Sequence, residues 1–170
     1  RTVNGSSFPK IRYSANSQQC TRPMPPEDLQ PQHLRPVNAL ALDVRSSGTR
    51  LFSAGVDGLV CVWDLDYQNM TATPRLNSKF RPHRSWIWDM KYCSHLSTVL
   101  TCSSDCTIKA WNVDTAHSAL ELGTHRDYVK ALAPSNASDW VASGSLDHNL
   151  CLWGLREGRK KPMWQIRTPS

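Results

Sequence analysis

The segment LFSAGVDGLVCVWDL, residues 51–65, decides the fold because its pattern occurs three times in the chain. VLTCSSDCTIKAWNV spans residues 99–113, and WVASGSLDHNLCLWGL spans residues 140–155. In each copy an aspartate lies six residues before a tryptophan, between two runs rich in Val, Leu, Cys and Trp. Such runs on either side of a turn are typical of paired strands. The pattern therefore predicts a β-hairpin in each copy.

The aspartate opens the turn of each hairpin. Asp57-Gly58 suits a tight two-residue hairpin, whereas Asp105-Cys106 and Asp147-His148 are poorer sequences for one. We therefore expect the aspartate to serve an additional purpose in all three copies.

Two further strands complete each unit. The apolar segment VNALALD, residues 37–43, precedes the first hairpin, and a histidine precedes the equivalent segment in each copy. Weaker apolar segments follow the tryptophans at residues 75–80, 118–123 and 163–168 and predict an outer strand. Four strands in a unit of about 42 residues are typical of a β-propeller blade.

The three copies resemble WD repeats, a β-propeller family. The resemblance implies a hydrogen-bonded tetrad in each copy: a histidine before the first strand, a serine or threonine on the second, an aspartate in the next turn and a tryptophan on the third. A closed chain of hydrogen bonds from indole to carboxylate gives every buried polar group a partner. The glycine usual before the histidine is Gln32, Pro82 or Thr124, and Trp-Asp is kept only at Trp63-Asp64. The implied tetrads are His33, Ser53, Asp57 and Trp63; His83, Thr101, Asp105 and Trp111; and His125, Ser143, Asp147 and Trp153.

The expected fold class is all-β, a partial propeller of about three four-stranded blades from a ring of seven or eight. Three blades cannot close a ring, so we expect the chain to be a fragment. The expected units are repeats at residues 33–82, 83–124 and 125–170, the last with a basic loop and an outer strand. Residues 1–32 contain five prolines and predict an irregular lead-in, in which FPKIRYS, residues 8–14, is a candidate ring-closing strand.

Composition and motifs exclude several classes of protein. The chain has 170 residues and a net charge of +6, without a membrane-spanning apolar run or a signal-peptide pattern, so we expect neither membrane insertion nor secretion. Its six cysteines form no CxxC pair, and no nucleotide-binding loop occurs, so we expect no metal and no cofactor. A catalytic Ser, His and Asp set occurs once, in a cleft, whereas this set recurs three times in register with strands. We therefore expect a protein that is not an enzyme.

Residues 33–166 more narrowly resemble the WD-repeat activators of ubiquitin-specific proteases, through HRDYVKALA at residues 125–133 and the three hairpin segments. This resemblance implies a cytoplasmic and nuclear scaffold that binds a ubiquitin-specific protease, with ubiquitin as a further candidate partner, and raises its activity. The alternative is a WD-repeat scaffold for RNA processing or chromatin that uses a basic surface. Its candidate residues are Arg156, Arg159, Lys160, Lys161 and Arg167, although no nucleic-acid-binding motif accompanies them.

The propeller resemblance also implies where a partner docks. Residues three and five after the tetrad histidine, and the residue before the tetrad aspartate, point onto the face around the central channel. Exposed aromatic residues with a nearby cation are typical of binding hot spots, which favours the second and third units. The alternation in SWIWDM leaves a second orientation open for Trp88, toward an adjacent blade. We call this set the interaction face: Pro36, Asn38 and Val56; Trp86, Trp88 and Ser104; Tyr128, Lys130 and Leu146.

Overall fold

The computed structural model of the chain describes residues 32–45, 48–65, 74–113, 119–135, 137–156 and 160–169. The chain divides into two compact units, Arg1–Gln30 and Pro31–Ser170, and all described residues belong to the second. The predicted lead-in and its candidate strand FPKIRYS therefore lie outside the described residues, apart from Gln32.

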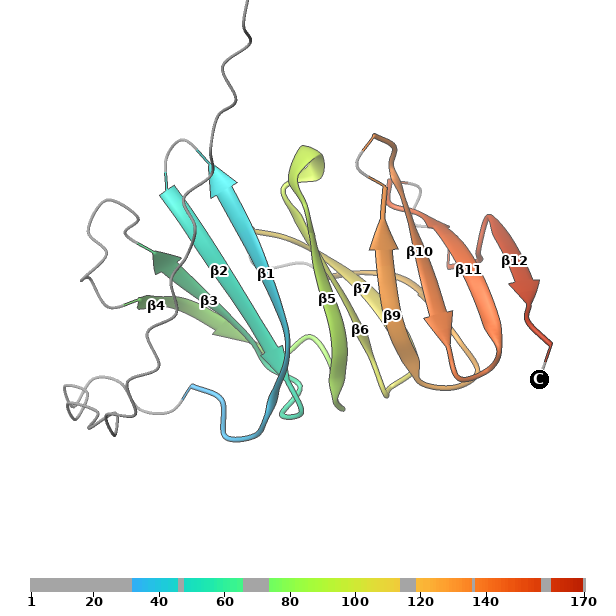
Figure 1. The fold of residues 1–170 in the computed structure, drawn as a ribbon, viewed down its shortest axis with the longest axis horizontal. Helices are drawn as coiled ribbons and strands as arrows, with labels where there is room; N and C mark the ends of the chain where they lie inside the picture. The colour runs from blue at the N-terminus through green and yellow to red at the C-terminus, as the bar shows by residue number, and fades with distance from the viewer. Residues whose placement is uncertain are drawn as a thin grey trace, which may run out of the picture. The chain divides into compact units, whose positions relative to one another are not determined.

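Three antiparallel sheets of four strands make up the described structure, which confirms the predicted all-β class (Figure 1). Each sheet is a meander in which strands pair in chain order. The described residues contain one short 3-10 helix, η1 (Ser94–Leu96), and no helix among them has the length and apolar character needed to cross a membrane. Sheet 1 comprises β1 (Val37–Arg45), β2 (Gly48–Gly55), β3 (Val60–Leu65) and β4 (Arg75–Phe80). Sheet 2 comprises β5 (Ile87–Cys93), β6 (Thr98–Ser103), β7 (Thr107–Asn112) and β8 (Ala119–Thr124), and sheet 3 comprises β9 (Val129–Pro134), β10 (Trp140–Ser145), β11 (Asn149–Gly154) and β12 (Trp164–Arg167).

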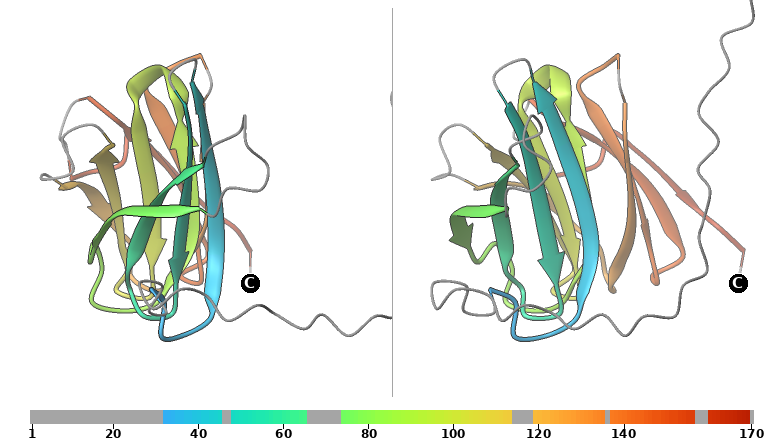
Figure 2. Two further views of the ribbon diagram at one scale, coloured as in Figure 1. Left: turned by 90° about the vertical axis from the view of Figure 1, so that its left-hand side faces the viewer. Right: turned by 60° about the vertical axis from the view of Figure 1, so that its left-hand side comes forward.

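The sheets pack face to face, with the first strands of each, β1, β5 and β9, side by side (Figure 1). The turned views show the sheets stacked one behind another (Figure 2). Phe52 and Val60 of sheet 1 pack with Met90 of sheet 2, while Leu100 and Ile108 of sheet 2 share a second core with sheet 3. Alternate residues of a strand point to opposite faces, so sheet 2 supplies apolar side chains to both cores.

A neighbouring sheet decides whether the first strand of a unit is buried. Met90 of β5 and Leu132 of β9 are 0% and 4% exposed, because a sheet covers each of them. Leu40 of β1 occupies the equivalent position, because all three residues lie seven residues after the histidine of their tetrad. Leu40 is nevertheless 62% exposed. The contact between sheets is therefore the main source of apolar burial in this fold.

Each first strand contains a β-bulge at the same position. The pairing register shifts between Val37 and Ala39 in β1, and between Ile87 and Asp89 in β5. In β9 the pairing passes from Val129 to Ala131. A bulge leaves one residue unpaired and redirects its side chain. The three bulged residues are Asn38, Trp88 and Lys130, the members of the interaction face five residues after the tetrad histidine.

The hairpin turns explain why an aspartate opens each of them. Gly58, Cys106 and His148 follow the aspartates and all adopt a positive φ, of 72°, 66° and 64°. This conformation costs a residue with a side chain roughly 1–2 kcal/mol. Each aspartate Oδ1 accepts a hydrogen bond from the backbone N–H two residues later, at 3.1, 3.1 and 2.9 Å. These bonds hold the turn where Cys or His replaces glycine, which is the additional purpose expected from the sequence.

Gly123 of β8 provides a test of the packing between sheets 2 and 3. A Cβ atom at this position would overlap the indole ring of Trp153. We expect Gly123→Ala to lower the free energy of unfolding by about 1–3 kcal/mol, the usual cost of overpacking a core. Gly144→Ala is the matched control, because its Cβ would lie 3.5 Å from the Leu150 side chain, an ordinary contact. Urea unfolding of both variants measures the difference, and equal midpoints would contradict the packing described.

Candidate functional site

Each sheet contains one continuous chain of hydrogen bonds through four polar side chains, the set that the resemblance to WD repeats implies. In sheet 1 the Trp63 indole donates to Ser53 Oγ at 2.9 Å, and Ser53 Oγ lies 2.8 Å from His33 Nε2. His33 Nδ1 lies 3.0 Å from Asp57 Oδ2. The imidazole therefore joins the strand that carries the serine to the turn that carries the aspartate.

The other two sheets repeat this geometry. In sheet 2 His83 lies 2.9 Å from Asp105 Oδ2 and 2.8 Å from Thr101 Oγ1. In sheet 3 His125 lies 3.0 Å from Asp147 and 2.8 Å from Ser143. The indole bonds are 3.4 Å from Trp111 to Thr101 and 2.7 Å from Trp153 to Ser143. The structure thus brings all twelve tetrad residues into three equivalent sets.

Two of the tetrad aspartates, Asp105 and Asp147, are held in the ionised form. Burial alone would raise the pKa of Asp105, but hydrogen bonds from His83 and Thr107 outweigh it and hold that pKa well below its usual range. At Asp147, burial is likewise outweighed by the backbone N–H groups of Arg126 and Asn149 and by His125, so its pKa is also lowered. A carboxylate whose oxygens already accept these bonds stabilises the turn rather than a substrate.

A second grouping of reactive residue types joins sheets 2 and 3. Cys93 Sγ lies 3.3 Å from His95 Nδ1, and His95 Nε2 lies 3.3 Å from Asp139 Oδ1. The Cys93 thiol is buried, and burial raises its pKa, which favours the protonated form that a nucleophilic cysteine must avoid. His95 therefore takes part in a contact between sheets 2 and 3 while its side chain stays 30% exposed.

The other thiols in the described residues are free. Burial raises the pKa of Cys102 to about 12, and those of Cys61 and Cys151 to about 11. Within the described ranges, no group of three or more His, Cys, Asp or Glu side chains is arranged to hold a metal ion. Cys61, Cys102 and Cys151 therefore act as small apolar core residues.

Backbone hydrogen bonds bring together two members of the interaction face in every sheet. Val56 N donates to Pro36 O at 2.9 Å in sheet 1, and Ser104 N donates to Trp86 O at 2.9 Å in sheet 2. Leu146 N donates to Tyr128 O at 3.0 Å in sheet 3. The residue three after the histidine and the residue before the aspartate therefore lie beside each other at the same end of each sheet.

Trp86, Trp88 and Lys130 form an aromatic cluster across sheets 2 and 3. The rings of Trp86 and Trp88 meet edge to face with centroids 5.6 Å apart, and Lys130 Nζ lies 2.8 Å from the Trp88 ring centroid. Trp88 Nε1 also donates to Ser104 Oγ at 2.7 Å. Trp88 is thus partly buried against the core of sheets 2 and 3, which combines the two orientations left open by the sequence.

Two polar contacts between sheets were not predicted from the sequence. Asn38 Nδ2 donates to Ile87 O of the next sheet at 2.8 Å, so this face residue also links sheets 1 and 2. Asp89 Oδ2 accepts a hydrogen bond from Leu132 N at 2.9 Å and links sheets 2 and 3. Their signal in the sequence is a polar residue near the start of a largely apolar strand, which is not specific enough to assign a partner.

The amino-acid sequence matches the model of a known protein family over more than half of the chain. The family described as "WD domain, G-beta repeat" (WD40) matches at residues 27–64, 74–112 and 117–154. The second match begins with β4 of sheet 1 and continues through β5, β6 and β7 of sheet 2. The second and third sequence repeats therefore each span two sheets, because the outer strand of one sheet leads directly into the histidine of the next.

Among solved structures, the chain is similar to the crystal structure of the computationally designed Ika4 protein. The two share 26% sequence identity with a TM-score of 0.62, over 75% of this chain and 71% of that chain. Together with the repeat matches, this likeness confirms the predicted all-β fold of four-stranded units as a partial β-propeller.

The lowered pKa values of Asp105 and Asp147 predict how stability depends on pH. An unfolded aspartate titrates near pH 3.9, so the stability from these carboxylates is present above about pH 5 and is lost as the pH falls toward their folded pKa. We expect the urea midpoint to decline as the pH falls from 6 toward 3. Asp105→Asn should lower the midpoint at pH 6 and make the decline shallower.

Asp64→Asn is the control for this experiment, because the Asp64 carboxylate is half-exposed and meets Asn77 and Arg50 outside the tetrads. This substitution should leave the urea midpoint at pH 6, and its decline as the pH falls, close to those of the unsubstituted chain. A decline in Asp105→Asn as steep as in the unsubstituted chain would contradict the role assigned to this carboxylate.

Proposed function

The chain belongs to the WD40 repeat family, whose repeats generally form protein-interaction scaffolds, and from this premise we propose that it binds a ubiquitin-specific protease and raises its activity. The observation that carries the proposal is the exposed aromatic surface of the interaction face. Trp86 is 44% exposed and Tyr128 is 46% exposed. Tryptophan and tyrosine are enriched in binding hot spots, where a partner excludes water from them.

Rigidity is the second support for this proposal. Trp88 is fixed by its bond to Ser104 and by Lys130 above its ring, and Trp86 packs against Trp88. A partner that docks on Trp86 therefore meets a preformed surface and loses little side-chain entropy on binding. Leu146 adds an exposed aliphatic side chain next to Tyr128. The proposed docking surface thus lies on sheets 2 and 3.

The identity of the partner rests on the resemblance of HRDYVKALA and the hairpin segments to activators of ubiquitin-specific proteases. In the proposed mechanism the scaffold adds no catalytic group. The docked protease domain is held in its active arrangement, and its activity rises because binding shifts the population toward that arrangement. We propose the cytoplasm and nucleus as the location, and free buried thiols suit such a reducing compartment.

The alternative, a nucleic-acid scaffold with a basic surface, has weaker support. Arg156 pairs with Asp139, and Lys160 Nζ lies 3.2 Å from Glu121. Two residues of the predicted basic stretch are therefore engaged with acidic groups of the same chain, which reduces the charge offered to a phosphate backbone.

The test measures binding of the chain to a panel of ubiquitin-specific protease catalytic domains by biolayer interferometry. Trp86→Ala and Tyr128→Ala should each cost about 2 kcal/mol of binding free energy, or about a thirtyfold rise in Kd. The same variants should reduce the stimulation of ubiquitin hydrolysis at chain concentrations just sufficient for the unsubstituted chain to saturate the protease.

Trp164→Ala is the matched control, because Trp164 is a tryptophan 54% exposed on β12, outside the interaction face. Its Kd should equal that of the unsubstituted chain. Failure of every protease domain to bind would contradict the proposed partner class. Binding that both alanine variants retain would contradict the docking surface.

A further inference from the structure

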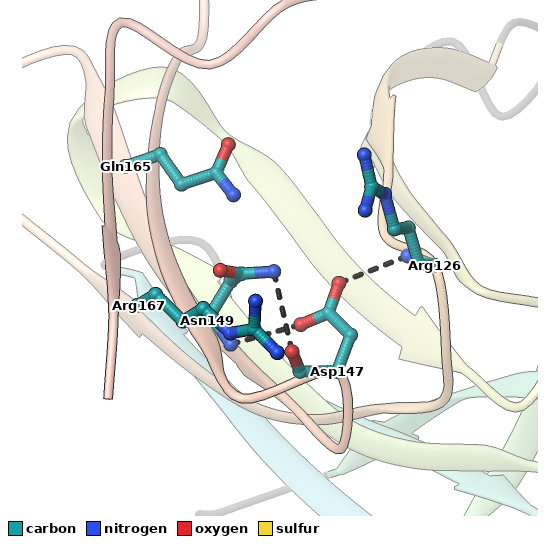
Figure 3. Close-up of a pocket in the computed structure, with 5 residues that line it drawn as sticks. All are labelled: Arg126, Asp147, Asn149, Gln165 and Arg167. Carbon is teal, nitrogen blue, oxygen red and sulfur yellow. Dashed lines mark hydrogen bonds between the residues drawn. The ribbon is translucent and has the colours of Figure 1, made fainter. Parts of the chain in front are cut away.

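A pocket of about 280 Å³ lies at the outer edge of sheet 3, next to its tetrad. Figure 3 shows the side chains of Gln165 and Arg167 extending from β12 toward the pocket, with Arg126 on the opposite side. Gln165 pairs with Cys151 and Arg167 with Asn149, so both belong to the face of sheet 3 that turns toward sheet 2. The lining residues are Arg126, Asp147, Asn149, Gln165 and Arg167.

The two guanidinium groups at this pocket have no acceptor among the described residues. The equivalent arginine in sheet 1 does have an acceptor. Arg81 occupies the position there that Arg167 occupies in sheet 3, and its guanidinium donates to the backbone carbonyl of Asp57 at 2.7 Å. In sheet 3 the equivalent carbonyl of Asp147 accepts a hydrogen bond from Asn149 Nδ2 instead, at 3.3 Å. The guanidinium of Arg167 is therefore left available to a ligand.

The charge at the pocket is positive before any ligand binds. Asp147 is the one acidic residue in the lining, against Arg126 and Arg167. Its carboxylate already accepts hydrogen bonds from His125 Nδ1 at 3.0 Å and from the backbone N–H groups of Arg126 and Asn149, each at 2.9 Å. Neither guanidinium is within ion-pair distance of it in the described structure. The arginines are thus free to bind an anion.

We propose that this pocket binds the phosphate monoester of a phosphoserine or phosphothreonine side chain in the protein partner. Such a group carries a charge of about −1.5 to −2 at pH 7 and has three strong acceptor oxygens. Two guanidinium groups and the Gln165 amide supply matching donors, whereas a carboxylate has only two oxygens and one charge. The combination therefore favours phosphate over an acidic side chain.

The pocket borders the interaction face, because Arg126 is two residues before Tyr128 and Asp147 directly follows Leu146. A partner segment lying over Tyr128 and Leu146 would reach the pocket with a neighbouring side chain. The inference thus rests on the proposed function, since it names a chemical feature of the same partner.

The direct test uses the complete chain and a fluorescein-labelled Gly-phosphoserine-Gly peptide, with binding measured by fluorescence anisotropy. The peptides Gly-Ser-Gly and Gly-Glu-Gly are the comparison probes. We expect the phosphorylated peptide to bind at least about tenfold more tightly than either comparison probe, since hydrogen bonds between charged groups are the stronger class. Arg126→Gln and Arg167→Gln should each raise its Kd by about tenfold or more.

Arg84→Gln is the matched control, because Arg84 directly follows the histidine of sheet 2 as Arg126 follows that of sheet 3, and its backbone N–H also donates to the tetrad aspartate. It should leave the Kd for the phosphorylated peptide unchanged. Arg126→Gln keeps that backbone bond, and Arg167→Gln changes only an outer strand, so circular dichroism should show both variants folded. Equal binding of the phosphorylated and glutamate peptides, or an equal effect of all three glutamine substitutions, would overturn the inference.

A second measurement separates this inference from the proposed function. Arg126→Gln and Arg167→Gln should weaken protease binding only when the partner is phosphorylated, whereas Trp86→Ala weakens it in either state. Protease binding that depends on Trp86 but not on the two arginines or on phosphorylation would overturn the phosphate site and leave the docking surface standing.

Discussion

Each sheet depends on one side-chain hydroxyl that joins two other members of its tetrad. The hydroxyl belongs to Ser53 in sheet 1, Thr101 in sheet 2 and Ser143 in sheet 3. It receives the indole N–H of a tryptophan on the third strand and lies 2.8 Å from the histidine Nε2 in every sheet. Because a carboxylate only accepts hydrogen bonds, the histidine Nδ1–H donates to the aspartate at the other end of the chain of bonds. Because these groups are largely buried, removing any member would leave another without a partner in a low-dielectric environment.

The hydrogen bonds of the tetrad also position the residues of the interaction face. The histidine fixes the start of each first strand, the bulge five residues later redirects one side chain, and the aspartate fixes the turn that faces it. In sheet 2 these constraints place Trp86, Trp88 and Ser104 together, and sheet 3 contributes Lys130 to the same cluster. The repeated polar interior and the variable exterior thus have separate roles, the first in stability and the second in recognition.

The fixed spacing of the repeats made the strands predictable, whereas the resemblance of these repeats to WD repeats implied the four members of each tetrad. Contacts between sheets were less predictable. The cation over the Trp88 ring and the contact from His95 to Asp139 depend on how closely two sheets approach, which no spacing within one repeat encodes. The sequence did not predict the proposed phosphate pocket, because the pocket depends on a difference in hydrogen bonding between two sheets. In sheet 1 Arg81 donates to the carbonyl of the tetrad aspartate, whereas in sheet 3 Asn149 donates to the equivalent carbonyl.

Hydrogen exchange of the indole Nε1–H protons, followed by NMR, tests the central role of the tetrads most directly. The indole protons of Trp63, Trp111 and Trp153 should exchange only through global unfolding, with Trp153 the best protected because its bond is short and its ring is buried. The exposed indole of Trp164 should exchange at the rate of a free side chain. Exchange of the three tetrad indoles as fast as that of Trp164 would contradict the account.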